Sequence, residues 1–125
     1  MNWKTYIMLF LCSVCVISGC ATTQPVDSRV RIIDELLNQN ISITEVLSRI
    51  NKGGFLEVQV TGFNRASSYK KLEYRIEWFD TNGFEIKTIL SGWTHIPAYK
   101  NSEFRFKAVA PKSSASNFRV LIRKG

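Results

Sequence analysis

Hydrophobic and polar residues alternate along most of the chain after residue 41, and this period of two indicates β-strands rather than helices. The clearest strand is residues 72–80, where apolar residues spaced two apart share one face and charged residues share the other. The apolar set is Leu72, Tyr74, Ile76 and Trp78, and the charged set is Glu73, Arg75 and Glu77. Further strands are predicted at residues 56–61, 84–90, 104–108 and 118–123, with a weaker one at 41–43 and 45–50 and an edge strand at 29–33.

Turn-forming residues separate these segments. Residues 80–83 (Asp-Thr-Asn-Gly) predict a tight turn in which Gly83 is free to adopt a positive φ. Residues 64–69 and 111–116 are polar loops, and only residues 34–39 predict a short helix. About seven short strands with no long crossover helix predict one all-β domain, an antiparallel immunoglobulin-like β-sandwich at residues 29–125. The predicted core is Leu56, Val58, Val60, Tyr74, Ile76, Trp78, Phe104, Phe106, Phe118, Val120 and Ile122, with Trp78 at its centre.

The first 19 residues have a different pattern, with one charged side chain, Lys4, ahead of an apolar run at 6–17. That run is shorter than the roughly 20 residues that span a bilayer, and it suits the hydrophobic part of a signal peptide. It ends in Ile17-Ser18-Gly19-Cys20, which resembles a bacterial lipobox. We therefore expect cleavage before Cys20 and acylation of its thiol, rather than an uncleaved signal anchor or a plain secretory signal. The predicted organisation is a signal peptide at 1–19, a lipidated cysteine and tether at 20–28, and the sandwich at 29–125.

The lipobox also bounds the location and the cysteine chemistry. Two or more acyl chains give stable membrane attachment, and Ala21 rather than aspartate after the cysteine resembles outer-membrane lipoproteins of Gram-negative bacteria. The expected location is the periplasmic face of the outer membrane. All three cysteines lie in the first 20 residues, which excludes a disulfide framework, a cysteine zinc site and a cysteine nucleophile in the domain.

The chain is basic, with a net charge of +7, and residues 20–125 carry 16 basic and 10 acidic side chains. Arg105, Lys107, Arg119, Arg123 and Lys124 fall on outward positions of the last two strands. If those strands are neighbours, they form a basic face for anionic lipid or peptidoglycan. The alternative is that these cations provide solubility and pair with Glu73, Glu77 and Glu103. Nucleic acid is excluded as a partner by the expected location.

No catalytic, metal or cofactor motif is found in the sequence. A lone histidine, His95, lacks the partners that a zinc site or a general base requires. Glu73 and Glu77 share a face but lie about 13 Å apart along a strand, too far for a glycosidase pair, and Arg75 stands between them. The segment 92–100 instead concentrates Trp93, His95, Pro97 and Tyr99, an amphipathic set that suits a partner-binding loop. The alternative for Trp93 is that it caps the end of the core.

Several segments together resemble the YcfL-like family of small periplasmic lipoproteins. They are residues 56–61, the run Leu72-Glu73-Tyr74-Arg75-Ile76-Glu77-Trp78-Phe79-Asp80 with Asn82-Gly83 after it, Gly92-Trp93, Phe106 with 108–111, and 115–123 with Ala115, Asn117-Phe118-Arg119 and Ile122-Arg123. The resemblance implies an immunoglobulin-like sandwich behind a lipobox and supplies no catalytic residues. Its members are often encoded beside an outer-membrane lipoprotein that activates a penicillin-binding protein.

These observations favour a non-enzymatic binding or accessory module that contacts an envelope protein or peptidoglycan, with cell-wall synthesis as one setting. A structural lipoprotein of a secretion or envelope assembly machine is the second hypothesis, and an envelope hydrolase is the third. The residues expected to contact a partner are Trp93, His95, Tyr99, Arg105, Lys107 and Arg119.

Overall fold

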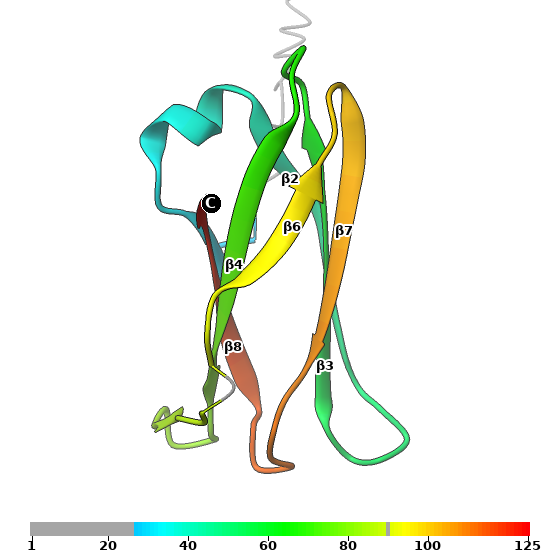
Figure 1. The fold of residues 1–125 in the computed structure, drawn as a ribbon. Coiled ribbons are helices and arrows are strands. Elements are labelled where there is room, and N and C mark those ends of the chain that lie inside the picture. The colour runs from blue at the N-terminus through cyan, green and yellow to red at the C-terminus, as the bar shows by residue number, and fades with distance from the viewer. Residues whose placement is uncertain (1–26, 90) are drawn as a thin grey trace, which may run out of the picture.

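Two β-sheets pack face to face in the computed structural model, which describes residues 27–89 and 91–125 (Figure 1). The elements are β1 (Val30–Ile32), the 3₁₀ helix η2 (Glu35–Gln39), β2 (Ile41–Ile50), β3 (Leu56–Asn64), β4 (Lys70–Phe79), β5 (Glu85–Ile86), β6 (Thr94–Ala98), β7 (Ser102–Val109) and β8 (Asn117–Lys124). The five-stranded sheet has the order β1-β8-β4-β5, with β6 also paired to β4, and the three-stranded sheet has the order β2-β3-β7. The predicted all-β sandwich is therefore confirmed.

The core lies between the two sheets and is formed by the inward positions of the alternating strands. Leu72, Val60, Val120 and Ile122 are fully buried, and every predicted core residue is buried except Tyr74. Tyr74 is half-buried and stacks on Phe106 with 4.1 Å between ring centroids. Trp78 is buried as predicted, but it lies near the end of β4 rather than at the centre. Among the described residues, all members of the core fall between Val30 and Ile122.

The weaker segments at either edge also form strands. Residues 41–50 make one strand rather than two, and a shift of register between Ile43 and Glu45 marks a β-bulge where the sequence alternation breaks. The predicted edge strand forms as β1, which runs parallel to β8 with Val30 opposite Val120. The sandwich is therefore not wholly antiparallel, because the chain leaves β1 through η2 and enters the other sheet instead of returning beside β8.

Two predictions for residues 84–100 were wrong. Of the strand predicted at 84–90, only Glu85 and Ile86 pair with β4, and the apolar side chains of Phe84 and Ile89 are exposed. The segment predicted as a loop at 92–100 instead contains β6, which pairs with residues 70–74 of β4. Pro97 fits there because β6 is an edge strand, where a residue without a backbone N–H is tolerated.

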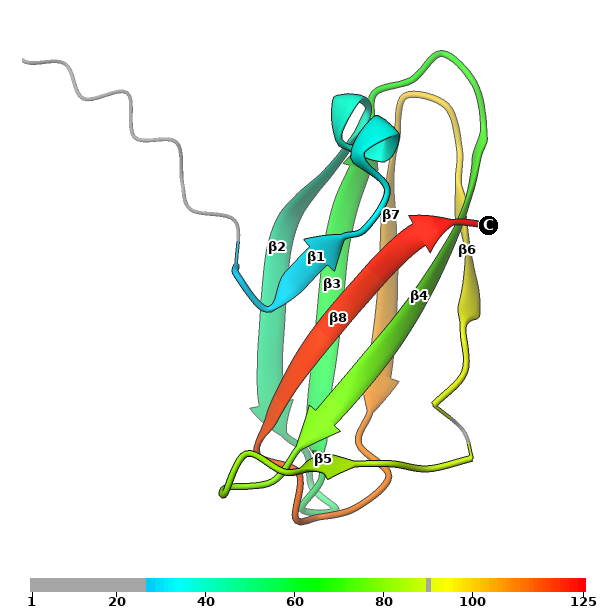
Figure 2. The same cartoon turned by 90° about the vertical axis from the view of Figure 1, so that its left-hand side faces the viewer.

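The strand directions gather the connections at two ends of the sandwich (Figure 2). One end carries η2 and the β3–β4 and β6–β7 connections, and the other carries the β2–β3, β4–β5 and β7–β8 connections. The predicted β4–β5 turn is confirmed, since Gly83 has a φ of 85° and Asp80 accepts hydrogen bonds from the backbone N–H groups of Asn82 and Phe84. No helix within the described residues has the length and apolarity to cross a bilayer.

Candidate functional site

The structure distributes the predicted partner-binding residues over three separate surfaces. Trp93, His95 and Arg119 belong to the outer face of the five-stranded sheet, whereas Arg105 and Lys107 belong to the outer face of the three-stranded sheet. Tyr99 lies beyond β6 at one end of the sandwich, beside Tyr69. The lipobox residues Ile17, Ser18, Gly19 and Cys20 lie outside the described residues, so their role stays a prediction.

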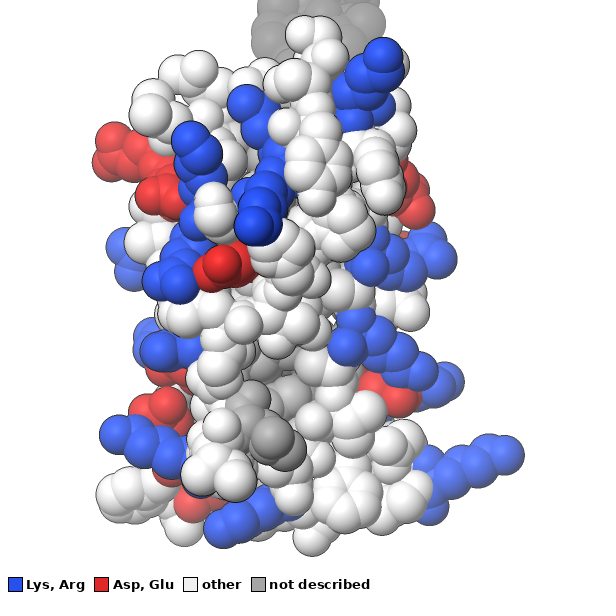
Figure 3. Space-filling model, viewed as in Figure 1, with Lys and Arg blue, Asp and Glu red and all other residues white. Residues whose placement is uncertain are grey.

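The basic face expected on the last two strands does not form. β7 and β8 are consecutive in sequence but belong to different sheets, because residues 110–116 cross from one layer to the other instead of forming a hairpin. Their outward cations therefore point away from each other on opposite sides of the sandwich. Figure 3, which looks toward the gap between the sheets, shows Lys, Arg, Asp and Glu side chains along both margins.

Charged side chains on the outer face of the five-stranded sheet form cross-strand ion pairs, as the pairing hypothesis predicts. Arg123 lies directly opposite Glu73 and donates two hydrogen bonds to its Oε2 at 2.9 and 3.0 Å. Arg119 lies opposite Glu77 and donates to both of its carboxylate oxygens, at 2.8 and 3.3 Å. Glu77 thereby raises the pKa of Arg119 above its ordinary value. The arginine side of each pair is open to solvent, where ion pairs add little to stability, so the pairs order this face more than they stabilise the fold.

Trp93 lies against this ion-paired face and not at the end of the core. The guanidinium carbon of Arg123 is 3.8 Å from the centroid of its ring, and that of Arg75 is 5.6 Å away. The indole is half-buried, so part of it remains accessible. Cation–π contacts of this kind contribute about 0.5–1 kcal/mol at exposed sites, enough to hold the ring in place. The expectation that Trp93 caps the core was wrong.

We call Glu73, Arg75, Trp93, His95 and Arg123 the Trp93 surface. His95 is exposed and lies directly opposite Glu73 in the β4–β6 pairing. Both hydrogen bonds from Arg123 end on Oε2 of Glu73, and among the described residues no hydrogen bond joins His95 to this carboxylate. The surface thus combines a partly accessible aromatic ring, an exposed histidine and two arginines that are paired with glutamates, a composition that suits a mixed polar and aromatic contact.

The three-stranded sheet carries a second group of ion pairs on its outer face. Glu57 accepts a hydrogen bond from Arg49 at 2.6 Å and pairs with Lys107 at 3.0 Å. These neighbours, Arg49 first, lower the pKa of Glu57 below its ordinary value. Arg105 donates to Glu103 at 3.0 Å and to the Thr61 hydroxyl at 3.2 Å. Because both predicted cations on this face have an acidic partner, neither is the centre of a basic patch.

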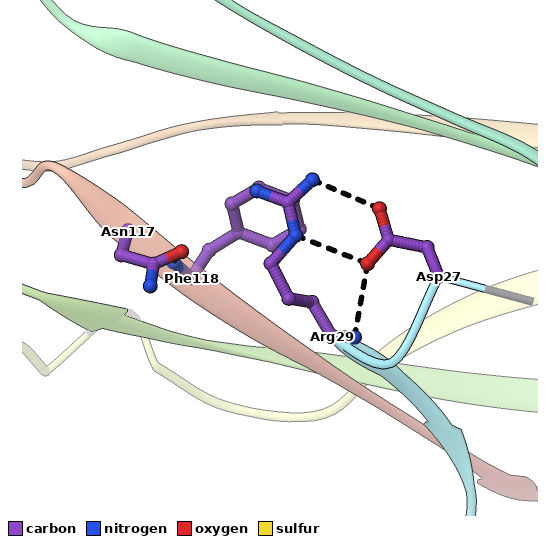
Figure 4. Close-up of polar contacts among 4 residues, drawn as sticks. All are labelled: Asp27, Arg29, Asn117 and Phe118. Carbon is purple, nitrogen blue, oxygen red and sulfur yellow. Dashed lines mark hydrogen bonds and ion pairs between the residues drawn. The ribbon is translucent and has the colours of Figure 1, made fainter.

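Asp27, Arg29 and Phe118 form a clamp that the sequence analysis missed. The Arg29 guanidinium donates to both carboxylate oxygens of Asp27 at 2.8 and 3.0 Å and lies 4.3 Å from the centroid of the Phe118 ring (Figure 4). The Arg29 side chain lowers the pKa of Asp27, and Asp27 raises that of Arg29. The Asp-x-Arg spacing beside the predicted tether was the available signal. The clamp fixes the start of the domain against β8.

The described residues contain no group of three or more His, Cys, Asp or Glu side chains placed to hold a metal ion.

Comparisons with known proteins place the chain in a family. A family model described as "Protein of unknown function (DUF1425)" matches residues 28–124. The fold is similar to a crystal structure of Campylobacter jejuni cj0090, with a TM-score of 0.63 and 22% identity over 79% of this chain and 100% of the other. It is also similar to a crystal structure of a DUF1425 family member from Shewanella sp. pv-4, with a TM-score of 0.62 and 19% identity over 68% of this chain and 78% of the other. No curated protein matches. Because the family match runs from residue 28 through β8, the chain belongs to the DUF1425 family of proteins of unknown function.

Proposed function

We propose that this protein is an outer-membrane lipoprotein, anchored on the periplasmic face through Cys20, that acts as a non-enzymatic binding or accessory module for a cell-envelope partner. The Trp93 surface carries the proposal. It presents a half-buried indole beside two arginines on the solvent side of a sheet, and Trp93 is not one of the core residues. A large aromatic ring in this position has little to contribute to folding and much to contribute to an interface.

The anchor is supported by sequence alone. The lipobox at residues 17–20 follows an apolar run of signal-peptide length, and the resemblance to the YcfL-like lipoproteins has the same design. Acylation is tested by mass spectrometry of the N-terminal peptide after expression of the full chain in a Gram-negative host. We expect a diacylglyceryl-modified Cys20 in the outer-membrane fraction, a Cys20→Ala chain without lipid, and an Ala21→Asp chain in the inner membrane. An unmodified Cys20 would contradict the anchor.

The binding role is supported by the accessibility and rigidity of the Trp93 surface. We would capture partners with the lipidated protein in cross-linked envelopes and compare the wild type with Trp93→Ala. A tryptophan at the centre of an interface weakens binding on the order of 30-fold when it is removed. The matched control is Phe84→Ala, which removes an aromatic ring of 72% exposure from the β4–β5 turn, outside the Trp93 surface.

The identity of what is recovered separates the hypotheses. An accessory role would be supported by recovery of cell-wall synthases, their activators or peptidoglycan fragments. These partners should be lost with Trp93→Ala and kept with Phe84→Ala. Components of a secretion or assembly machine would favour the structural hypothesis instead. Partner recovery that is identical in wild type and Trp93→Ala would remove the Trp93 surface from the proposal.

A further inference from the structure

The end of the sandwich that carries η2 also carries the β3–β4 and β6–β7 connections and the end of β8 (Figure 2). We call it the loop end. Side-chain contacts join its parts, since Arg65 donates to the carbonyl of Gln39 at the end of η2. One hollow of about 510 Å³ at this end is lined by Ile33, Asp34, Glu35, Leu36, Lys70 and Lys124, among others.

The loop end concentrates cations that have no acidic partner. They are Arg65, Lys70, Lys71, Lys100 and Lys124, and none of them forms an ion pair with another described residue. The acidic residues at this end are Asp34, whose carboxylate accepts the backbone N–H of Lys124, Glu35, and Glu103, which pairs with Arg105. The five unpaired cations therefore exceed the two acidic residues that lack a cationic partner by three charges, whereas the arginines on the sheet faces are largely neutralised by glutamates. In the upper part of Figure 3, blue side chains surround uncharged atoms near the middle of the view, and red side chains lie at the two margins.

Exposed apolar side chains lie among these cations. Leu36 is 79% exposed, Tyr99 64% and Tyr69 48%. The two tyrosine rings lie 5.5 Å apart. The fully buried side chain of Asn64 holds their loops together, because its Nδ2 lies 3.0–3.1 Å from the carbonyls of Ser68, Ala98 and Tyr99. The tyrosine pair is thus fixed in an exposed position.

We infer that the loop end docks on anionic lipid headgroups of the membrane in which the Cys20 anchor is inserted, an inference that rests on the proposed function for the anchor. Basic side chains near a negatively charged leaflet are attracted to it. Tyrosine places its ring in the apolar part of the interface and its hydroxyl in the headgroups, and lysine stems extend in the same way. Charge complementarity and the exposed tyrosines together favour a lipid surface as the occupant.

The tether length is compatible with this orientation. Residues 20–27 reach about 24 Å when fully extended. The carbonyl of Arg29 accepts a hydrogen bond from the N–H of Val120, which lies four residues before Lys124, or about 13 Å along a strand. Asp27 therefore lies close enough to the loop end for the tether to reach the bilayer when the loop end rests on it. The Trp93 surface then faces sideways, open to a partner.

The test uses the mature chain with Cys20→Ser, which retains every described core residue but carries no lipid. Its binding is measured by co-sedimentation with vesicles that contain phosphatidylglycerol and with vesicles of phosphatidylcholine alone. We expect binding only to the anionic vesicles, weakening as salt is added. The double variant Lys70→Glu/Lys100→Glu should bind at least about 25-fold more weakly, at roughly fivefold for each basic charge removed near the surface.

The matched control is Lys52→Glu/Lys112→Glu, which has the same net charge but changes the opposite end, and it should bind nearly as the wild type does. Tyr69→Ser/Tyr99→Ser should weaken binding without changing the charge. Equal loss in the two charge variants, or no binding to anionic vesicles at low salt, would overturn the inference. The inference would also be overturned if the wild type did not bind vesicles but bound a protein partner that the Lys70→Glu/Lys100→Glu variant no longer bound. Neither result affects Cys20 acylation or partner capture through Trp93, so failure here is distinguishable from failure of the proposed function.

Discussion

Asn64 is expected to be the most important polar side chain for the stability of this fold. It is fully buried, and besides the three carbonyls near its Nδ2, its Oδ1 accepts the backbone N–H of Ala66 at 2.9 Å. These bonds connect the β3–β4 connection to the residues that lead from β6 to β7. Replacing Asn64 with alanine removes all of them at once.

The cost can be estimated from the groups left without partners. Asn64→Ala leaves two buried backbone groups unpaired, the N–H of Ala66 and the carbonyl of Ala98. An unsatisfied buried group costs about 1–3 kcal/mol. For two groups we therefore expect a loss of about 2–6 kcal/mol, a large fraction of the roughly 5–15 kcal/mol that stabilises a domain of this size.

The assay is urea unfolding of the unlipidated mature chain, followed by circular dichroism, with Asn38→Ala as the control. Asn38 is exposed in η2, and its replacement should change the free energy of unfolding by no more than about 0.5 kcal/mol. Asn64→Asp is a sharper test, because a carboxylate there would face three carbonyl oxygens. Burial and these dipoles raise the pKa of such a group, so its deficit should be smaller near pH 5 than near pH 8. An Asn64→Ala chain within about 1 kcal/mol of the wild type would refute the reasoning.

Two further predictions concern packing and charge. A Cβ atom at Gly62 would clash with Cζ of the buried Phe104 ring, so Gly62→Ala should lower the free energy of unfolding by about 1–3 kcal/mol in thermal or urea unfolding. A Cβ atom at Gly92 meets no atom within 4 Å, so Gly92→Ala should be neutral, and equal stability of the two variants would contradict the prediction. The pKa of Glu57 is lowered from its ordinary 4.5, so the stabilisation it provides is present above that value and is lost as the pH falls through the lower folded-state pKa. The free energy of unfolding should therefore fall less steeply with decreasing pH for Glu57→Gln than for the wild type or for the exposed-site control Glu45→Gln.

Much of the fold could be predicted because alternation reports the face of each residue directly. In β4 the inward Leu72 and the outward Glu73 follow from the period of two alone, and so do the glutamate–arginine pairs once β8 is placed beside it. β6 shows the limit of this approach. In this strand the residues Thr94, Ile96 and Ala98 share one face, as in any strand, but Pro97 between them suggested a loop. Only the position of the strand at the edge of its sheet makes that proline acceptable.

The candidate sites were harder to predict because they depend on which sheet each strand joins. Arg105 and Arg119 are both outward residues of well-predicted strands, yet they lie on opposite faces of the sandwich. Tyr69 and Tyr99 are 30 residues apart and meet only because the β3–β4 and β6–β7 connections share an end. No local pattern encodes these contacts.

From its residues alone the chain is assigned a β-sandwich with a defined inner and outer face, and an N-terminal lipid anchor is predicted. These properties depend on the spacing of apolar residues and on a short linear motif, and both are local. The tertiary structure decided that β7 and β8 face opposite sides, that Trp93 lies against Arg123 instead of in the core, and that unpaired cations gather at the loop end. The alternation of apolar and polar residues fixes only which face of its own strand a side chain lies on. Which residues of other strands it contacts depends on the order of the strands and on the packing of the two sheets.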